Sequence, residues 1–175
     1  MPGGMKVVVN DANVLIDLVE LGLLPHFFAL EMEFHTTTII LNELFEAQIE
    51  ALTPFIENGS LLVHELGEEE LEEIVAIRIQ KPNLSEQDCS ALFKARSLAA
   101  TLLTSDNSLR KFAKSQAVDV HGHFWILDRM VEAQTISPLS ASEKLTLLCE
   151  TVNPKLGLPK SEREKRHKTW KKQIN

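Results

Sequence analysis

The N-terminal part of the chain changes its hydrophobic spacing at residue 11. Residues 6–10 form a short run rich in valine, and apolar side chains then recur at helical spacing at Val14, Leu15 and Leu18. A β-branched run is typical of a strand, and the second spacing is typical of a helix. The pattern therefore predicts a strand that passes into a helix at residue 11, where an aspartate stands.

The same alternation continues to about residue 150. Further strands are predicted at residues 33–38, 61–66, 101–104 and 118–121. Helices are predicted directly after residue 38, with Glu43 about one turn into the helix, and at residues 51–57, 68–80, 85–98, 107–115, 122–132 and 138–150. Strands that alternate with helices favour a mostly parallel sheet covered on both faces. The expected fold is therefore a three-layer α/β domain with a central, mostly parallel sheet flanked by helices.

Length and composition agree with one compact domain. The chain has 175 residues, of which 44% are hydrophobic, and this is enough for one substantial core. No apolar run approaches the roughly 18 residues of a membrane span, and residues 1–5 lack the features of a signal peptide. Cys89 and Cys149 have no metal-site or disulfide-framework spacing, so we expect buried or half-buried thiols in a reducing cytoplasm.

Charge divides the chain into two parts. Residues 1–154 hold 10 Lys and Arg against 23 Asp and Glu, a net charge of −13, whereas residues 155–175 hold 8 against 2, a net charge of +6. Pro154 and Pro159 bound a linker between the two parts. We therefore expect a domain at residues 1–154 and a basic C-terminal tail at residues 155–175.

The tail is expected to form a short basic helix that contains one tryptophan. Lys165, Arg166, Lys168 and Trp170 are candidates for substrate binding, because bases stack on aromatic rings and phosphates pair with cations. An equal alternative is that the helix docks on the acidic body or on a neighbouring subunit, with Trp170 as its apolar anchor. The sequence leaves both uses of the tail open.

Four acids stand near the ends of four separate segments. They are Asp11, Glu43, Asp88 and Asp106. Taken singly, each has a structural explanation: the three aspartates suit helix caps, with Ser85 completing a capping box for Asp88, and Glu43 suits a solvated helix. Sites in open α/β sheets form outside the carboxyl ends of the strands, where Asp11 and Asp106 are expected. Carboxylates that converge there repel one another unless a hard divalent cation is present, and oxygen ligands favour Mg²⁺ or Mn²⁺.

Four motifs in this order carry a resemblance to a known family. They are Val-Val-Val-Asn-Asp-Ala-Asn at 7–13, Leu-Asn-Glu-Leu at 41–44, Ser-Glu-Gln-Asp-Cys-Ser-Ala-Leu at 85–92 and Leu-Leu-Thr-Ser-Asp-Asn-Ser-Leu-Arg at 102–110. Over roughly residues 5–137 the chain resembles PIN-domain nucleases, and it is most similar to the VapC-type toxin ribonucleases of bacterial toxin–antitoxin pairs.

The resemblance implies a function and a set of roles. It implies an endoribonuclease that uses Mg²⁺ or Mn²⁺, with Asp11, Glu43, Asp88 and Asp106 as metal ligands. Asn13 and Thr104 are implied to orient the carboxylates. It also implies an RNA substrate, a homodimer and an antitoxin partner. Ser105 stands where some relatives carry another acid, so a fifth carboxylate is absent or moved. The alternative is a non-catalytic PIN-like module that binds RNA or protein.

Three other polar residues near these motifs have structural interpretations. Asp17 is expected on the exposed side of the first helix by its spacing from Asp11. His121 and His123 flank Gly122 near the expected site. Contact with substrate is one use for them, and a hydrogen-bonded or exposed histidine is the more frequent one for lone residues of this kind. No serine or cysteine has a histidine partner in sequence that would indicate nucleophilic catalysis.

Overall fold

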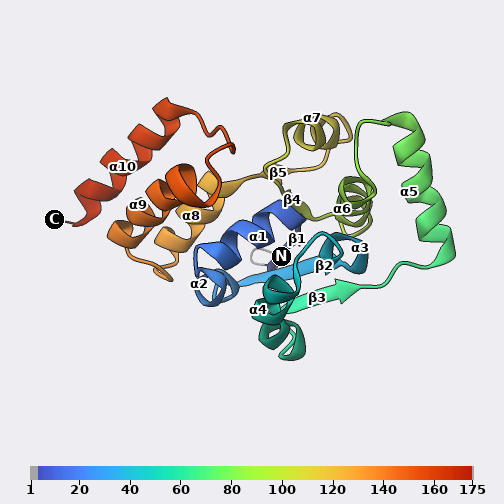
Figure 1. The fold of residues 1–175 in the computed structure, drawn as a ribbon, viewed down its shortest axis with the longest axis horizontal. Helices are drawn as coiled ribbons and strands as arrows, with labels where there is room; N and C mark the ends of the chain where they lie inside the picture. Colours follow the sequence, from blue (N-terminus) through green and yellow to red (C-terminus); the bar gives the residue numbers. More distant parts are fainter. Residues whose placement is uncertain (1–3, 175) are drawn as a thin grey trace.

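The central feature of the computed structural model is a five-stranded sheet, and the structure describes residues 4–174 (Figure 1). All pairings between neighbouring strands are parallel, and the strand order is β3-β2-β1-β4-β5. The strands are β1 (Lys6–Asn10), β2 (Met32–Thr37), β3 (Leu61–His64), β4 (Thr101–Leu103) and β5 (Val120–His121). The predicted α/β class is therefore confirmed, and the sheet is wholly rather than mostly parallel.

Helices cover both faces of the sheet. They are α1 (Ala12–Glu20), α2 (Leu24–Phe28), α3 (Thr38–Leu41), α4 (Glu46–Glu57), α5 (Glu68–Gln80), α6 (Glu86–Ser97), α7 (Asn107–Ser115), α8 (His123–Glu132), α9 (Pro138–Leu147), a π-helical turn (Leu148–Val152) and α10 (Lys160–Ile174). Because crossovers between parallel strands are right-handed, α1 before β2 and α6 before β4 are expected on opposite faces of the sheet. On the second face, α6 packs across β1, β2 and β4.

The middle strands are apolar because they are covered on both sides. Val8 and Val9 in β1 and Leu102 and Leu103 in β4 are all fully buried. Continuous apolar runs of this kind are typical of parallel strands inside an α/β sheet. The pairing of Asn10 with Leu103 brings the carboxyl ends of β1 and β4 level with each other.

The chain changes direction between β1 and β4. From β1 it proceeds to β2 and β3 on one side, and it then crosses to β4 and β5 on the other. The connections that follow β1 and β4 therefore leave the sheet toward opposite faces. A crevice forms outside the carboxyl ends of strands at such a switch point, and ligands of α/β proteins bind there.

The helix predicted after residue 38 is interrupted in the structure. Thr37 caps α3 by accepting a hydrogen bond from the Ile40 amide, and α3 ends at Leu41. Tighter bonds from the amides of Glu43 and Leu44 to carbonyls three residues earlier form a turn. The turn buries Leu44 and leaves Phe45 78% exposed. Glu43 therefore lies in a turn. The prediction of one continuous helix is wrong because Phe45 has an extended backbone and its amide bonds to the Gln48 side chain, which starts α4 as a new helix.

The C-terminal helix packs on the rest of the protein. α10 lies along α9 (Figure 1), and the Trp170 side chain is 2% exposed. Arg166 donates from Nε and Nη2 to Asp128 in α8 and from Nη1 to Glu162 within α10. This is the docking alternative for the tail, with the tryptophan as its apolar contact. Within residues 4–174, none of the helices is both long and apolar enough to cross a membrane.

We expect Trp170→Ala to lower the free energy of unfolding by about 3 kcal/mol, because the change leaves a cavity under α10. The matched control is Lys171→Ala, which alters the next side chain of the same helix where it is exposed. Urea unfolding of both variants measures the difference. Equal midpoints for the two variants would show that the tryptophan contributes nothing to docking of α10.

Candidate functional site

Asp11 and Asp106 lie at the carboxyl ends of β1 and β4, beside the switch point. The Asp11 amide donates to the Leu103 carbonyl at 3.0 Å, so the turn after β1 is fixed to the end of β4. The Asp11 side chain is 2% exposed and caps α1 by accepting from the Ala12 amide at 2.9 Å. Asp106 is half-buried and caps α7 by accepting from the Leu109 amide at 2.7 Å.

Thr104 connects these two acids. Its buried hydroxyl donates to Oδ2 of Asp11 at 2.6 Å and accepts from the Asp106 amide at 3.1 Å. The contact with Asp11 is the one that an orienting residue would make. Asn13 bonds to the loop next to Asp106 and not to an acid, since its Oδ1 accepts from the Ser105 amide at 3.3 Å. Asn13 therefore holds the loop that carries Asp106 and does not contact Asp11 through a hydrogen bond.

Asp88 enters the site from the first turn of α6. The capping box predicted with Ser85 is present: the Ser85 amide donates to Oδ2 of Asp88, and the Asp88 amide donates to the Ser85 hydroxyl. Two residues later, the Ser90 hydroxyl forms a hydrogen bond of 3.1 Å with Thr37. Because Thr37 caps α3, this bond fixes the end of β2 and the start of α3 against α6.

The acids are close enough to change one another's protonation. Burial raises the pKa of Asp11 to about 7; the Thr104 hydroxyl and the Ala12 amide lower this pKa, while the charges of Asp88 and Glu43 raise it. Burial is also the first cause that raises the pKa of Asp88, to which the charge of Asp106 adds. The pKa of Glu43 is raised by partial burial of its carboxyl group and then by the charge of Asp88. All four predicted acids therefore belong to one electrostatic group.

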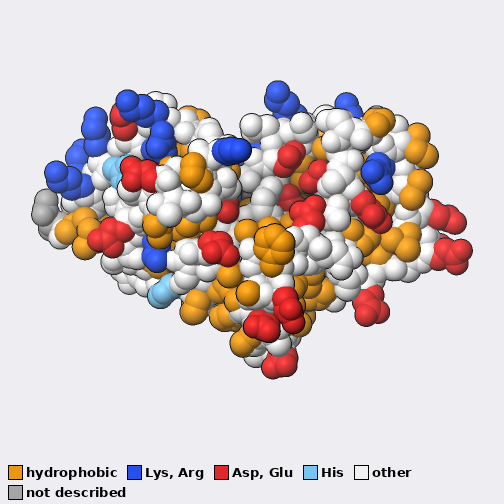
Figure 2. Space-filling model, in the orientation of Figure 1, with side chains coloured by type: hydrophobic (Ala, Val, Ile, Leu, Met, Phe, Trp, Pro, Cys, Tyr) orange, Lys and Arg blue, Asp and Glu red, His pale blue; other side chains and the backbone are white. Residues whose placement is uncertain are grey.

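The four carboxylates do not form a closed set of ligands as the side chains stand. Within residues 4–174, no three His, Cys, Asp or Glu side chains are arranged to hold a metal ion together. One oxygen of Asp88 and one of Asp106 are engaged by helix amides, and the hydrogen bonds of the described chain leave the second oxygen of each without a partner. Acidic side chains gather near the centre of the face in Figure 2. The donor set is oxygen only, which suits Mg²⁺ or Mn²⁺.

Arg110 lies beside this group, although its motif in the sequence predicted no role for it. Its Nη1 donates to the Thr104 carbonyl at 3.2 Å. A Cβ atom on Gly122 would stand 2.6 Å from that nitrogen, so a glycine is needed at position 122 for the arginine to lie there. The signal in the sequence was the spacing from Asp106 to Arg110, which places both residues on one side of α7.

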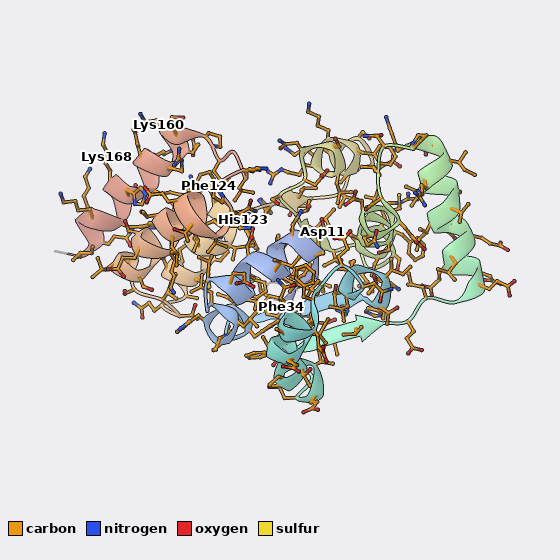
Figure 3. All side chains as sticks on the ribbon, viewed as in Figure 1. Asp11, Phe34, His123, Phe124, Lys160 and Lys168 are labelled. Atoms are coloured by element: carbon orange, nitrogen blue, oxygen red, sulfur yellow. The ribbon has the colours of Figure 1, made fainter. Side chains whose placement is uncertain are left out.

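Asp17 is buried, and its predicted exposure is wrong. Its side chain is 4% exposed and accepts from Nε2 of His123 at 2.8 Å and from the Asn153 side chain at 3.1 Å. These bonds join α1, α8 and the segment that follows the π-helical turn, which explains why a carboxylate tolerates burial there. His123 is hydrogen-bonded as expected. In Figure 3, His123 and Phe124 lie between the C-terminal helices and the part of the molecule that carries Asp11.

The tail residues predicted to bind substrate have different surroundings. Lys165 and Lys168 are exposed on the outer side of α10, where Lys and Arg side chains gather in Figure 2. Arg166 is paired with two carboxylates, and its guanidinium lies 4.2 Å from the ring centre of Phe124. Burial of Trp170 leaves no ring face for a base, so the prediction of a stacking role is corrected to a packing role.

This chain was compared with known sequences and solved structures. No curated protein matches the sequence. Among solved structures, PAE2754 from Pyrobaculum aerophilum is 18% identical with a TM-score of 0.51, and the match covers 73% of this chain and 96% of that one. A PilT N-terminus domain protein from the hyperthermophilic archaeon Sulfolobus solfataricus P2 is 17% identical with a TM-score of 0.46, covering 75% and 94%.

A family model carries more weight than these distant folds, since it matches most of the sequence. Residues 7–152 match the family DUF3368, which is described as a PIN domain. The matched range begins in β1 and ends with the π-helical turn, so it contains Asp11, Glu43, Asp88 and Asp106, and α10 lies outside it. The chain therefore belongs to the PIN-domain family.

Proposed function

We propose that the protein is a Mg²⁺- or Mn²⁺-dependent endoribonuclease. One observation carries the proposal: four separate segments bring four acids to one switch point, where burial and mutual repulsion raise the pKa of three of them. Like charges collected without a neutralising partner destabilise a fold, and a divalent cation is the partner that carboxylates accept. Membership of a family whose members are commonly nucleases supports the same function.

The chain's own residues position the acids for that task. Thr104 fixes Oδ2 of Asp11, and Asn13 fixes the loop that leads to Asp106. Asp11, Glu43, Asp88 and Asp106 would hold the cation. A bound Mg²⁺ or Mn²⁺ supplies an activated water and offsets the negative charge that develops during attack on a phosphodiester. The carboxylates position the ion and do not themselves attack phosphorus.

The finer proposal is a toxin-type ribonuclease of the VapC kind, active in the cytoplasm as a homodimer and restrained by an antitoxin. The resemblance of the four motifs supports the toxin type, and two free cysteines suit a reducing compartment. A non-catalytic module that binds RNA is the second candidate. The exposed lysines of α10 favour it, because they would attract phosphates without any chemistry.

The raised pKa of Asp11 makes stability depend on pH. The folded protein holds this proton up to about pH 7, whereas the unfolded chain releases it near the ordinary pKa of 3.8. The contribution of Asp11 to the free energy of unfolding is therefore fully present below the pKa of the unfolded chain, and it is lost as the pH rises through the pKa of the folded protein. Without a cation, ionised Asp11 destabilises the protein above neutral pH.

In metal-free protein, we expect Asp11→Asn to raise the free energy of unfolding by about 2 kcal/mol at pH 8, because it removes a buried charge. The gain should disappear near the unfolded pKa, where the wild-type carboxyl is protonated. Urea unfolding in EDTA at both pH values measures it, with the exposed Glu31→Gln as control. A difference from wild type that does not change with pH would contradict the burial of a titrating carboxyl.

Cleavage of labelled single-stranded RNA should require Mg²⁺ or Mn²⁺ and should stop in EDTA. Asp11→Asn or Asp106→Asn should slow it by about 100-fold or more, since a displaced ion misplaces the nucleophile. Asp119→Asn is the matched control, because Asp119 directly precedes β5 and so lies at the amino ends of the strands, whereas Asp11 and Asp106 lie at the carboxyl ends. Metal-dependent cleavage that survives both substitutions would refute the site, and RNA binding without cleavage would favour the non-catalytic module.

Expression of the wild-type chain in a bacterial host should arrest growth if it is a toxin, and Asp11→Asn should not, because only the first cleaves cellular RNA. Growth curves after induction measure this, with immunoblots to match the amounts of the two proteins. Normal growth at matched amounts, from a chain that cleaves RNA in vitro, would exclude the toxin type and leave the ribonuclease standing.

A further inference from the structure

A cavity of about 440 Å³ lies beside the acidic site, between the domain and its C-terminal segment. Ser105 and Asn107, which flank Asp106, line one side, and the start of α8 lines another. Residues 156–159 and the side chains of Glu162 and Arg166 in α10 complete the wall. The volume falls in the range of small-molecule sites and is sufficient for one nucleotide. Figure 2 shows the molecule indented between the C-terminal helices and α7.

Arg110 lines this cavity with a positive charge that no carboxylate of the described residues pairs with. Within residues 4–174 its side chain takes part in no ion pair and donates one hydrogen bond, from Nη1 to the Thr104 carbonyl. Arg166, which lines the same cavity, differs because Asp128 and Glu162 already neutralise it. A guanidinium with unused donors matches a phosphate group.

The N-terminus of α8 adds further donors at the same place. Gly122 caps α8 without any side chain, whereas α1, α6 and α7 are capped by Asp11, Ser85 and Asp106. The first residues of α8 line the cavity, and the amides of an uncapped first turn attract anions.

His123 forms part of the wall between this cavity and α1. It lines the cavity and is 4% exposed, with Nε2 bonded to Asp17. Its Nδ1 has no hydrogen-bond partner among the described residues. Because Nε2 donates to Asp17, Nδ1 of the neutral ring is an acceptor, so His123 forms part of the wall while Arg110 and the amides of α8 are the donors.

We propose that this cavity binds a phosphate of the RNA strand next to the phosphodiester that is cleaved, with Arg110 and the N-terminus of α8 as its donors. The proposal rests on the ribonuclease function. A neighbouring phosphate is the fitting ligand because the cavity shares the loop that holds Asp106, so a strand lying across the acids continues into it. The C-terminal segment then acts as a wall of the substrate site.

The test measures binding of a labelled single-stranded RNA to the full chain in EDTA, where no metal-dependent cleavage occurs, over a range of KCl concentrations. Each phosphate contact on a single strand contributes about 0.7 to the slope of log Kd against log salt. Arg110→Gln should lower this slope by about 0.7 and weaken binding several-fold. Arg110→Lys should retain most of the slope, and the exposed Arg96→Gln should leave it unchanged.

Further measurements separate the proposal from its rivals. If Arg110 served only to hold Thr104, Arg110→Gln would slow cleavage and leave the metal-free slope unchanged, which would overturn the proposal. An Arg110-dependent affinity for inorganic phosphate or a mononucleotide, without any change in the RNA slope, would also overturn it. If Arg110→Gln lowers the slope but the wild-type chain cleaves no RNA with Mn²⁺, phosphate binding in the cavity would be supported and the ribonuclease function would be refuted. Thermal unfolding of each variant confirms that it is folded.

Discussion

Burial and mutual repulsion of four carboxylates gathered beside the carboxyl ends of β1 and β4 are the constraint on which this structure depends. Burial and mutual charge raise the pKa of Asp11 to about 7, and they raise the pKa of Asp88 and of Glu43 as well. The fold tolerates the group because helix amides and the Thr104 hydroxyl satisfy individual oxygens. A capping role and a metal-binding role are therefore compatible for these acids: each aspartate accepts from a backbone amide at the start of a helix, and Asp88 and Asp106 each keep one oxygen without a partner among the described residues.

Alternation of apolar runs and helical spacing predicted the α/β class and most elements, because buried parallel strands and amphipathic helices each leave a local pattern. What it missed depends on individual contacts, some of them between distant residues. Glu43 lies in a turn because α4 starts as a new helix at Phe45, whose amide bonds to the Gln48 side chain. Asp17 is buried because His123 and Asn153, more than a hundred residues later, bond to it. Arg110 belongs to the motif at residues 102–110, but its position beside the acids depends on the absence of a side chain at Gly122.

The C-terminal segment packs against the domain, although its composition was also that of a separate basic tail. Its positive charge was compatible both with RNA binding and with docking on the acidic body. In the structure the segment packs on the body through the buried Trp170 and the ion pair of Arg166 with Asp128. Docking keeps the lysines of α10 exposed and places residues 156–159 over a cavity next to Asp106. The segment thereby connects the basic end of the chain with the acidic site, although it lies outside the matched family range.

Sharing of one divalent cation by the four acids is best tested by an anomalous difference map from crystals grown or soaked with Mn²⁺ at pH 8, where Asp11 is ionised. We expect at least one Mn²⁺ peak within ligating distance of Asp11 and of at least one of Glu43, Asp88 and Asp106, with side chains rotated toward it. Full-length crystals with Mn²⁺ bound elsewhere, and none at Asp11, would contradict it.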